Sequence, residues 1–527
     1  MGKRIGNHPA LWLVCGAVCT AFTLVFPVVG WLEWITMIPL FLGVYRLFDG
    51  EGRLTHTTAY RYGFLTVYAF YVVMYHWFVS LYPLDFVGLD KGPAAAVVAL
   101  AWFGLPLLQA IPGGLIFVFY GIVGRTEICR RAPILRPVLF SALWVVFEWS
   151  STLHWTGVPW GRLALGQVEC LPALQSASLL GSYFVSFLLL LVNGLLAYGL
   201  LYHKKALVPS LLAGILFFAN FQFGWIRGLV KTPEGERVSV AVVQGNVGSQ
   251  EKWDPEAELR TLEIYADYTR KASAKGAEIV VWPETIILHD IHYDGPYRHF
   301  VTELAKECGV SLFVGAFYNS DGDPTESYNA IYLVHPDGTL DETVYGKRHL
   351  VPFGEYVPMR EFVTAIFPPL ADISMLESDL APGKDSALFD TAYGQMGALV
   401  CFDSIYEQLA LDSVSDGADV LLIASNDSWF LDSKAIEQHL AQAQLRAIEC
   451  GKPILRAAST GISAVITEEG ELLSSIAPLT EGYAVEEITV PTSTSVYGRI
   501  GNLFVAMCAA APLVLWMVDL LLRKLWK

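Results

Sequence analysis

One cysteine in this sequence stands where a buried strand gives way to a helix, a position suited to chemistry. The apolar run 397–400 predicts a strand that ends on Cys401, and Asp403 follows two positions later. Side chains at the carboxyl ends of strands in open α/β sheets face the crevice where ligands usually bind. Most free cysteines, however, are simply small buried hydrophobic residues. Cys401 is therefore a candidate nucleophile whose role depends on the rest of the chain.

Two charged residues elsewhere in the chain could activate this thiol. The strand-like run 278–282 is followed by Pro283, which cannot donate to a sheet ladder, so Glu284 lies at a strand exit. Lys347 lies in a stretch that contains two Gly and two Pro residues. An ordinary cysteine is mostly protonated at neutral pH and needs a base or a nearby cation. Glu284 could accept the thiol proton, and Lys347 could stabilise the thiolate and then an oxyanion, although either alone is more often a solvated charge.

The composition of the chain is that of a membrane protein. Its 527 residues are 54% hydrophobic and 13% aromatic, with a mean hydropathy of +0.44. The formal net charge of −16 argues against a nucleic-acid partner, because a phosphate backbone is bound through surplus Lys and Arg. The eight cysteines form no CxxC pair and no His/Cys cluster at zinc spacing. We therefore expect neither a metal site nor a disulfide framework, and no cofactor.

Long apolar runs predict about eight membrane spans. They are residues 10–28, 31–48, 59–80, 93–122, 134–152, 172–201, 206–226 and 500–522. The polar, Asp- and Glu-rich sequence before the last run predicts a domain outside the bilayer. The expected domains are an N-terminal transmembrane domain (1–231), an α/β domain (232–496) and a C-terminal span with a short tail (497–527).

The distribution of basic residues predicts the orientation of the chain. With the N-terminus inside, eleven Lys and Arg residues fall in the inner segments, whereas the outer short loops hold little beyond Lys91 and Arg162. If the N-terminus is inside, seven membrane crossings place the chain from residue 228 onward at the outer face. The last span then brings the chain back to the inside. We expect a multi-pass protein of the cytoplasmic membrane with cytoplasmic termini and an extracytoplasmic domain 232–496.

Within that domain, short β-branched runs alternate with helical stretches, which predicts sheets covered by helices. The expected strands are 238–244, 278–282, 311–317, 330–334, 397–401, 418–424, 453–456 and 462–466. The expected helices are 255–275, 297–308, 404–414 and 435–450.

The order and spacing of these residues resemble a known family. Glu284, Lys347 and Cys401 match the Glu-Lys-Cys triad of the nitrilase (carbon–nitrogen hydrolase) superfamily. Multiple spans, an extracytoplasmic nitrilase-like domain and one closing span resemble the bacterial apolipoprotein N-acyltransferase family. Further motif matches are residues 244–246, 253–255, 328–329, 351–358, 425–430, 455–456 and 460–462. The resemblance covers essentially the whole chain and implies an αββα sandwich joined to a multi-pass helical domain.

The resemblance implies an acyl transfer in two steps. Cys401 would attack a membrane glycerophospholipid, leaving a thioester on the enzyme and releasing a lysophospholipid. The acceptor would be the N-terminal α-amino group of an S-diacylglyceryl cysteine on a lipoprotein. The implied partners are therefore a phospholipid acyl donor, a diacylated lipoprotein acceptor and the lipid bilayer.

The same resemblance implies supporting roles for residues around the triad. Glu355 resembles a second glutamate that would orient Lys347 or share base duty with Glu284, or it could merely cap a loop. Asp403 is the expected supporting acid beside the nucleophile. The residues expected to shape the substrate site are Trp253, Asn329, Phe402, Trp429 and Phe430. Of these, Asn329 could instead be a turn former and Trp253 a core aromatic.

Two departures from the family pattern bear on substrate preference. The best-known members carry Tyr-Glu where this chain has Phe402 and Asp403. They also carry a Gly-rich turn where this chain has residues 431–434. Both places lie near the expected acyl or acceptor pocket, so we expect them to affect donor and acceptor recognition more than the triad.

Two other functions are open from the sequence. A membrane-tethered amidase or hydrolase would use water in place of the amine, although a hydrolase of small amides gains nothing obvious from eight spans. A transporter or receptor with an inactive outer domain is the other alternative. Spans of an ion pathway usually carry a buried run of acidic or basic residues, and these spans lack one, with Glu33 and Glu148 near span ends as exceptions.

Overall fold

The computed structural model describes residues 8–49, 54–84, 90–202, 206–230, 235–248, 251, 255–320, 326–366 and 379–525. The chain divides into two compact units, which we call the helical unit and the α/β unit. The helical unit comprises Met1–Val79, Ala96–Lys231 and Ile500–Lys527. The α/β unit comprises Ser80–Ala95 and Thr232–Arg499.

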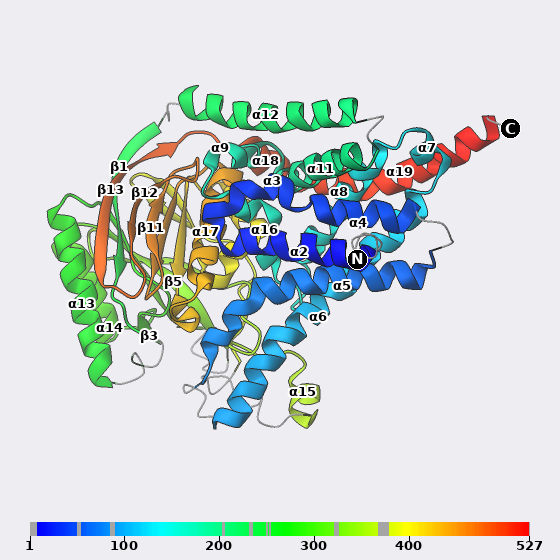
Figure 1. Ribbon diagram of the computed structural model, residues 1–527. Helices are drawn as coiled ribbons and strands as arrows, with labels where there is room; N and C mark the ends of the chain where they lie inside the picture. The colour runs from blue at the N-terminus through cyan, green and yellow to red at the C-terminus, as the bar shows by residue number, and fades with distance from the viewer. Residues whose placement is uncertain are drawn as a thin grey trace. The chain divides into compact units, whose positions relative to one another are not determined.

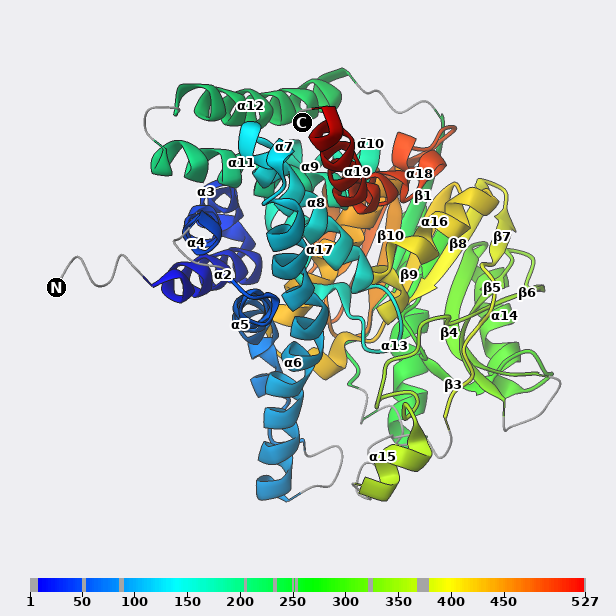
Figure 2. The ribbon, with the colours of Figure 1, turned by 90° about the vertical axis from the view of Figure 1, so that its right-hand side faces the viewer.

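Apolar helices make up the helical unit (Figures 1 and 2). Its longer helices are α2 (Pro9–Val25), α4 (Ile38–Asp49), α5 (His56–Met74), α6 (Lys91–Val123), α8 (Leu135–Ser150), α11 (Ser182–Leu201), α12 (Leu207–Val230) and α19 (Leu503–Leu525). Its short helices are α3 (Glu33–Thr36), α7 (Glu127–Arg131), α9 (Leu171–Leu174) and α10 (Ala177–Leu180).

Each of the eight predicted spans is largely helical. Six helical stretches in the described part of the chain are long and apolar enough to cross a membrane: Pro27–Asp49, His56–Leu81, Lys91–Val123, Ser182–Leu201, Leu207–Leu229 and Leu503–Arg523. The other two, α2 and α8, have 17 and 16 residues, which is shorter than the roughly 20 residues that a span needs. The multi-pass helical fold is confirmed, with a span count between six and eight.

Glu33 and Glu148, the acidic residues near span ends, lie inside the helical unit. Glu33 Oε2 accepts a hydrogen bond from Gln167 Nε2 at 2.9 Å. Glu148 Oε1 accepts from Trp144 Nε1 at 3.1 Å and from the backbone N–H of Leu163 at 3.0 Å. Buried carboxylates require such donors. Through these hydrogen bonds, the two carboxylates connect residues 163–167 to the neighbouring helices α3 and α8.

The α/β unit contains two sheets of mixed strand direction. The first has the strand order β13-β1-β2-β4-β5-β6 with β3 beside β4, and the second has the order β12-β11-β10-β9-β8-β7. The strands of the first are β1 (Gly235–Gln244), β2 (Ile279–Val281), β3 (Ile287–Asp290), β4 (Ser311–Asn319), β5 (Ser327–Val334), β6 (Leu340–Gly346) and β13 (Gly482–Pro491). Those of the second are β7 (Leu388–Thr391), β8 (Gly394–Val400), β9 (Val420–Ser425), β10 (Ile454–Ala458), β11 (Ser463–Ile466) and β12 (Leu472–Ile476). The central strands β1, β2 and β4 are parallel, as are β8, β9 and β10.

The sheets pack face to face between two layers of helices (Figure 1). One apolar core takes side chains from both sheets, such as Val242 and Phe313 from the first and Val400 and Leu422 from the second. A second core joins the outer face of the first sheet to α13 (Pro255–Ala274) and α14 (Pro296–Cys308). The second sheet is covered by α16 (Glu407–Asp416) and α17 (Lys434–Cys450), and two short helices, α15 (Arg360–Ile366) and α18 (Val496–Ile500), complete the unit. The predicted αββα sandwich is confirmed.

The predicted strands and helices of this unit are all present, with boundaries that differ by up to three residues. Cys401, for example, lies just beyond β8 and not in the strand predicted at 397–401. The helix expected at 404–414 begins only at Glu407, because Cys401–Ile405 first form a 3₁₀ segment. Five strands were not predicted: β3, β6, β7, β12 and β13. They lack an apolar run because many of their side chains are partly exposed, as in Leu472–Ile476, where exposed and half-buried residues alternate before the last one is buried.

Gly315 in β4 permits a close approach of two chain segments. A Cβ atom at this position would lie 2.2 Å from the carbonyl oxygen of Pro283 and 2.9 Å from the Cα atom of Glu284. The backbone N–H of Ile286 also donates to the Gly315 carbonyl at 2.9 Å. The turn that follows β2 therefore lies directly against β4, and no side chain fits between them.

Gly315→Ala should consequently destabilise the α/β unit and displace Glu284. We expect the free energy of unfolding to fall by about 1–3 kcal/mol, since a methyl group is forced into a filled space. Thermal unfolding of the detergent-solubilised protein measures this change. Gly248→Ala is the matched control, because a Cβ atom there meets nothing within 4 Å. Equal stability of the two variants would contradict the close approach.

Candidate active site

The strand-to-helix turn after β8 presents Cys401 in a strained conformation. β8 ends at Val400, and Cys401 opens the 3₁₀ segment with a φ of +48°. A positive φ is uncommon for a residue with a Cβ atom and persists only where surrounding contacts hold it. Only 8% of the Cys401 surface is exposed. The turn therefore holds a nearly enclosed thiol in a fixed direction.

Asp403 links the turn that holds Cys401 to the segment that carries Lys347. Its Oδ2 atom accepts from the backbone N–H of Val400 at 3.1 Å and from the Tyr345 hydroxyl at 2.8 Å. Its Oδ1 atom accepts from the backbone N–H of His349 at 2.7 Å. Burial raises the pKa of Asp403 to about 6, and the Lys347 ammonium acts in the opposite direction. The buried Asp403 thus connects the end of β8 in the second sheet to the end of β6 in the first sheet and to the residues that follow it.

The ammonium group of Lys347 lies between two carboxylates. Lys347 Nζ donates to Glu284 Oε1 at 3.0 Å and to Glu355 Oε1 at 2.9 Å. Asn329 Nδ2 donates to the same two oxygens, at 2.6 Å and 3.0 Å. The Lys347 side chain is 1% exposed. Glu284 from the loop after β2, Lys347 and Glu355 from the loop after β6, and Asn329 from β5 thus form one buried hydrogen-bonded group.

The electrostatics of this group keep the resting thiol protonated. Burial raises the pKa of Cys401, the Glu284 carboxylate raises it further, and the Lys347 ammonium opposes both. For Lys347, burial lowers the pKa, but Glu284 and Glu355 outweigh it and raise the pKa well above its usual value. The lysine is therefore a permanent cation. The thiol becomes a thiolate only if a neighbouring base takes its proton.

The structure shows the surroundings of three of the four other residues that were predicted to shape the substrate site. The Phe402 ring packs edge-on against Tyr406, with ring centroids 5.4 Å apart. Trp429 and Phe430 lie half-buried in the 3₁₀ segment Asp427–Phe430 that follows β9. Trp253 lies outside the described residues.

A buried polar network beside Cys401 was not predicted from the sequence. His439 Nδ1 lies 2.9 Å from Asp427 Oδ1, and Arg456 Nη2 donates to Asp427 Oδ2 at 2.6 Å. The other ring nitrogen of His439 faces the backbone carbonyl of Cys401 at 3.3 Å. All three side chains are at most 1% exposed. The motif stretches 425–430 and 455–456 contain two members, but nothing in the helical stretch 435–450 marks His439.

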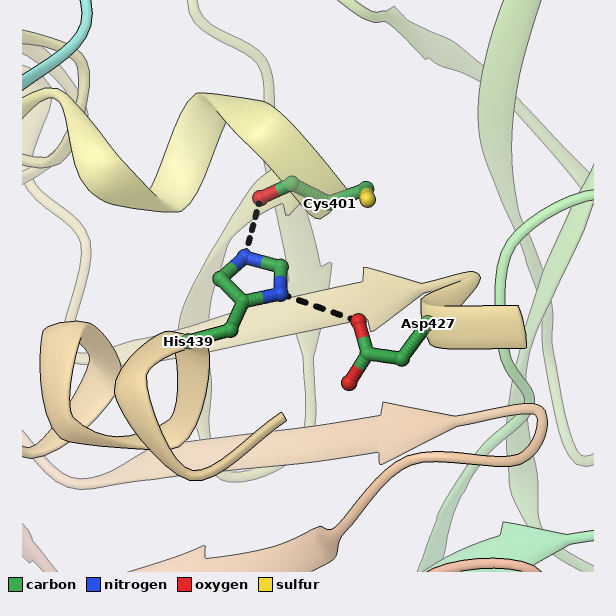
Figure 3. Close-up of side chains that lie close together, drawn as sticks. All are labelled: Cys401, Asp427 and His439. Atoms are coloured by element: carbon green, nitrogen blue, oxygen red, sulfur yellow. Dashed lines mark hydrogen bonds and ion pairs between the residues drawn. The ribbon is translucent and has the colours of Figure 1, made fainter. Parts of the chain in front are cut away.

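Two residues of this network, Asp427 and His439, could also bind a metal ion together with Cys401. The ligand atoms of Cys401, Asp427 and His439 lie within 4.8 Å of one another. Figure 3 shows, however, that the two nitrogens of the imidazole already face the Cys401 carbonyl and Asp427. The guanidinium of Arg456 already balances the Asp427 charge and, after burial, holds the pKa of that carboxyl below its usual range. The donor set therefore suits hydrogen bonding more than metal binding.

Opposite charges beside Cys401 should shift its titration in opposite directions. Glu284→Gln removes a negative charge and should lower the thiol pKa, whereas Lys347→Met removes a positive charge and should raise it. The pH at which iodoacetamide alkylation of Cys401 reaches half its maximal rate measures both shifts. Glu437→Gln, at an exposed ion pair on α17, is the control and should leave the profile unchanged. Shifts in one direction for both variants would contradict the site electrostatics.

Comparisons with known proteins agree with this architecture. Residues 16–195 match the family model of the apolipoprotein N-acyltransferase N-terminal domain, and residues 239–497 match that of the carbon-nitrogen hydrolases. A solved structure of a carbon-nitrogen hydrolase from Helicobacter pylori G27 superposes with a TM-score of 0.37 and 19% sequence identity, over 48% of this chain and 89% of that one.

Two relatives that are named apolipoprotein N-acyltransferase match along nearly the whole chain. An apolipoprotein N-acyltransferase from Gloeobacter violaceus is 29% identical over 94% of this chain and 91% of its own length. One from Geobacter metallireducens is 31% identical over 97% of this chain and 95% of its own length. With both domain models matched in order, this protein belongs to the apolipoprotein N-acyltransferase family.

Proposed function

We propose that this protein transfers a fatty acyl chain from a membrane glycerophospholipid to the N-terminal α-amino group of an S-diacylglyceryl cysteine on a lipoprotein. The observation that carries the proposal is the buried group in which Lys347 joins Glu284 and Glu355 beside the Cys401 thiol. Membership of the family supplies the reaction class, and the apolar helices supply the membrane setting. Cys401, Glu284 and Lys347 are the proposed catalytic residues.

In the first half-reaction, the thiol is converted into a thioester. Glu284 takes the proton of Cys401, and the sulfur attacks the ester carbonyl of the phospholipid. The oxyanion that forms is stabilised by the Lys347 ammonium, which stays charged throughout. The tetrahedral intermediate collapses by expelling the lysophospholipid oxygen, which receives the proton held by Glu284.

In the second half-reaction, the amine replaces the sulfur. The uncharged α-amino group attacks the thioester carbonyl, and Glu284 accepts a proton from the attacking nitrogen. Lys347 again stabilises the oxyanion. Collapse of this intermediate forms the amide bond and releases the Cys401 sulfur, to which Glu284 returns the proton. The residues that carried the first step are thereby restored.

We also infer how the chain is arranged about the bilayer. Residues 232–496 form the extracytoplasmic catalytic domain, and residues 1–231 and 497–527 hold it at the cytoplasmic membrane. The excess of Lys and Arg in the inner segments supports this orientation and cytoplasmic termini. Donor and acceptor then meet at the outer face, with Phe402, Trp429 and Phe430 as candidate contacts for the substrates.

Labelled phospholipid tests the nucleophile. The purified protein, incubated with phospholipid that carries a labelled acyl chain, should form a labelled thioester, and Cys401→Ala should form none. Cys450→Ala is the matched control, because Cys450 is also a buried free cysteine and should leave labelling intact. A labelled thioester that persists in Cys401→Ala would overturn the assignment.

Adding an acceptor separates the transferase from a hydrolase. With a diacylated lipopeptide present, mass spectrometry should find a third acyl chain on its N-terminal cysteine. Release of free fatty acid at the same rate with and without the lipopeptide would instead identify water as the acceptor. That outcome would support the membrane-tethered hydrolase.

Reporter fusions test the orientation. Alkaline phosphatase fused after residue 235 should be active, because the enzyme folds only outside the cytoplasm, and a fusion after the C-terminal residue should be inactive. The reverse pattern would contradict cytoplasmic termini. A green fluorescent protein fused at the same two positions provides the control, since its fluorescence should show the opposite dependence.

A further inference from the structure

Leu431 ends the 3₁₀ segment after β9 in a backbone conformation that side chains rarely adopt. Its φ is +48° and its ψ is −143°. Glycine reaches this region readily, whereas a residue with a Cβ atom is strained there. Leu431 opens the stretch 431–434, where the family pattern has a Gly-rich turn. The chain therefore carries a leucine at a position whose backbone favours glycine.

Neither burial nor backbone hydrogen bonding requires a leucine at this position. Leu431 is 47% exposed, so packing against the protein offsets little of the strain. The turn is closed by the backbone N–H of Leu431, which donates to the Ser428 carbonyl at 3.3 Å, and any residue except proline supplies such a donor. The next helix, α17, is capped by the Ser433 side chain, which accepts from the backbone N–H of Ala435. Residues held in strained conformations cluster at functional sites.

The segment that Leu431 ends lies close to the reacting sulfur. Asp427 begins this segment, and one of its carboxylate oxygens lies within 4.8 Å of the Cys401 sulfur. Leu431 follows four residues later, an advance of about 8 Å along a 3₁₀ helix. An extended fatty acyl chain reaches about 15 Å, half the thickness of the hydrocarbon core of a bilayer. An acyl chain on the Cys401 sulfur is therefore long enough to reach Leu431, whereas an acetyl group is not.

The side chains of this segment suit an apolar ligand. Trp429 and Phe430 precede Leu431 and are half-buried. The Phe430 ring lies edge-on to the ring of His439, with the centroids 5.7 Å apart, and His439 in turn faces the Cys401 carbonyl. An amine would need a hydrogen-bond acceptor, which none of the three side chains 429–431 provides. The alkyl part of an acyl chain needs only apolar contact.

We propose that Leu431 contacts the fatty acyl chain while that chain is attached to Cys401, and that it thereby favours long acyl chains over short ones. This inference deepens the proposed function and rests on it, because that function supplies the acyl chain. In the acylated enzyme, the contact buries apolar surface that is exposed in the free enzyme. Leu431 is thus a specificity-determining residue that takes no part in the proton transfers.

Two esters with the same leaving group test this contact. Attack of Cys401 on a p-nitrophenyl ester forms the thioester C–S bond, breaks the ester C–O bond and releases nitrophenolate, while the thiol proton passes to the proposed base Glu284. In the detergent-solubilised protein, Leu431→Gly and Leu431→Ala should each slow acylation by the dodecanoyl ester about 10-fold. Both should leave acylation by the acetyl ester unchanged, because its acyl group is too short to reach Leu431. Release of nitrophenolate, corrected for release by Cys401→Ala, measures both rates.

Thermal unfolding of the same two variants tests the strain. Glycine usually stabilises a folded protein less than alanine does, because it loses more conformational freedom on folding. At position 431 this order should be reversed, and Leu431→Gly should unfold at a higher temperature than Leu431→Ala. The usual order would show that this turn accepts a Cβ atom without strain, and it would overturn the inference.

Leu473→Ala is the matched control. Leu473 is 40% exposed and lies on the edge strand β12, near the amino-terminal ends of the parallel strands β9 and β10 and away from Asp427. Its replacement should affect neither ester. Equal slowing of both esters by Leu431→Gly, or slowing of neither, would overturn the proposal. If the nitrophenyl esters acylate Cys401 but phospholipid never does, the proposed function fails, whereas the comparison of the two esters still decides the role of Leu431.

Discussion

The site depends on one buried cation held between two carboxylates. Lys347 has almost no exposed surface, and its ammonium contacts both Glu284 and Glu355. Removing one partner from a buried ion pair commonly costs about 3–5 kcal/mol, because the other charge stays buried and uncompensated. Three charges of alternating sign therefore require one another. These ion pairs therefore help to fix the positions of the loops that carry the three residues.

The sandwich explains how residues so far apart in the chain reach one place. Glu284, Lys347 and Glu355 follow or neighbour strands of the first sheet, whereas Cys401 follows β8 of the second. The apolar core between the sheets sets their spacing, and Asp403 joins the two edges by hydrogen bonds. A shorter side chain than the Glu expected from the family pattern is sufficient here, because its oxygens reach backbone N–H groups on both segments.

Patterns that lie within one short stretch could be predicted from the sequence, and those that depend on packing could not. The apolar run before Cys401 and the Pro283 break before Glu284 place both residues at strand exits, and the structure has them there. His439 lies in a helical stretch of ordinary composition, and its contact with Cys401 depends on how α17 packs on the second sheet. The same applies to Arg456, whose approach to Asp427 follows from the parallel pairing of β9 and β10. Strands such as β12 were missed because partial exposure removes the apolar run that predicts a strand.

The assembly of the site from two sheets has a consequence for the newly made chain. A polypeptide emerging beside a bilayer could damage lipids if it carried a reactive thiol from the start. Here the thiol has an ordinary environment until β2, β6 and β8 have found their places, because the base, the cation and the constrained turn come from separate segments. Even then, burial and the Glu284 carboxylate raise the pKa of the thiol, which keeps it protonated at rest. On the proposed function, only the folded sandwich would then cleave an ester of the membrane in which the chain is made.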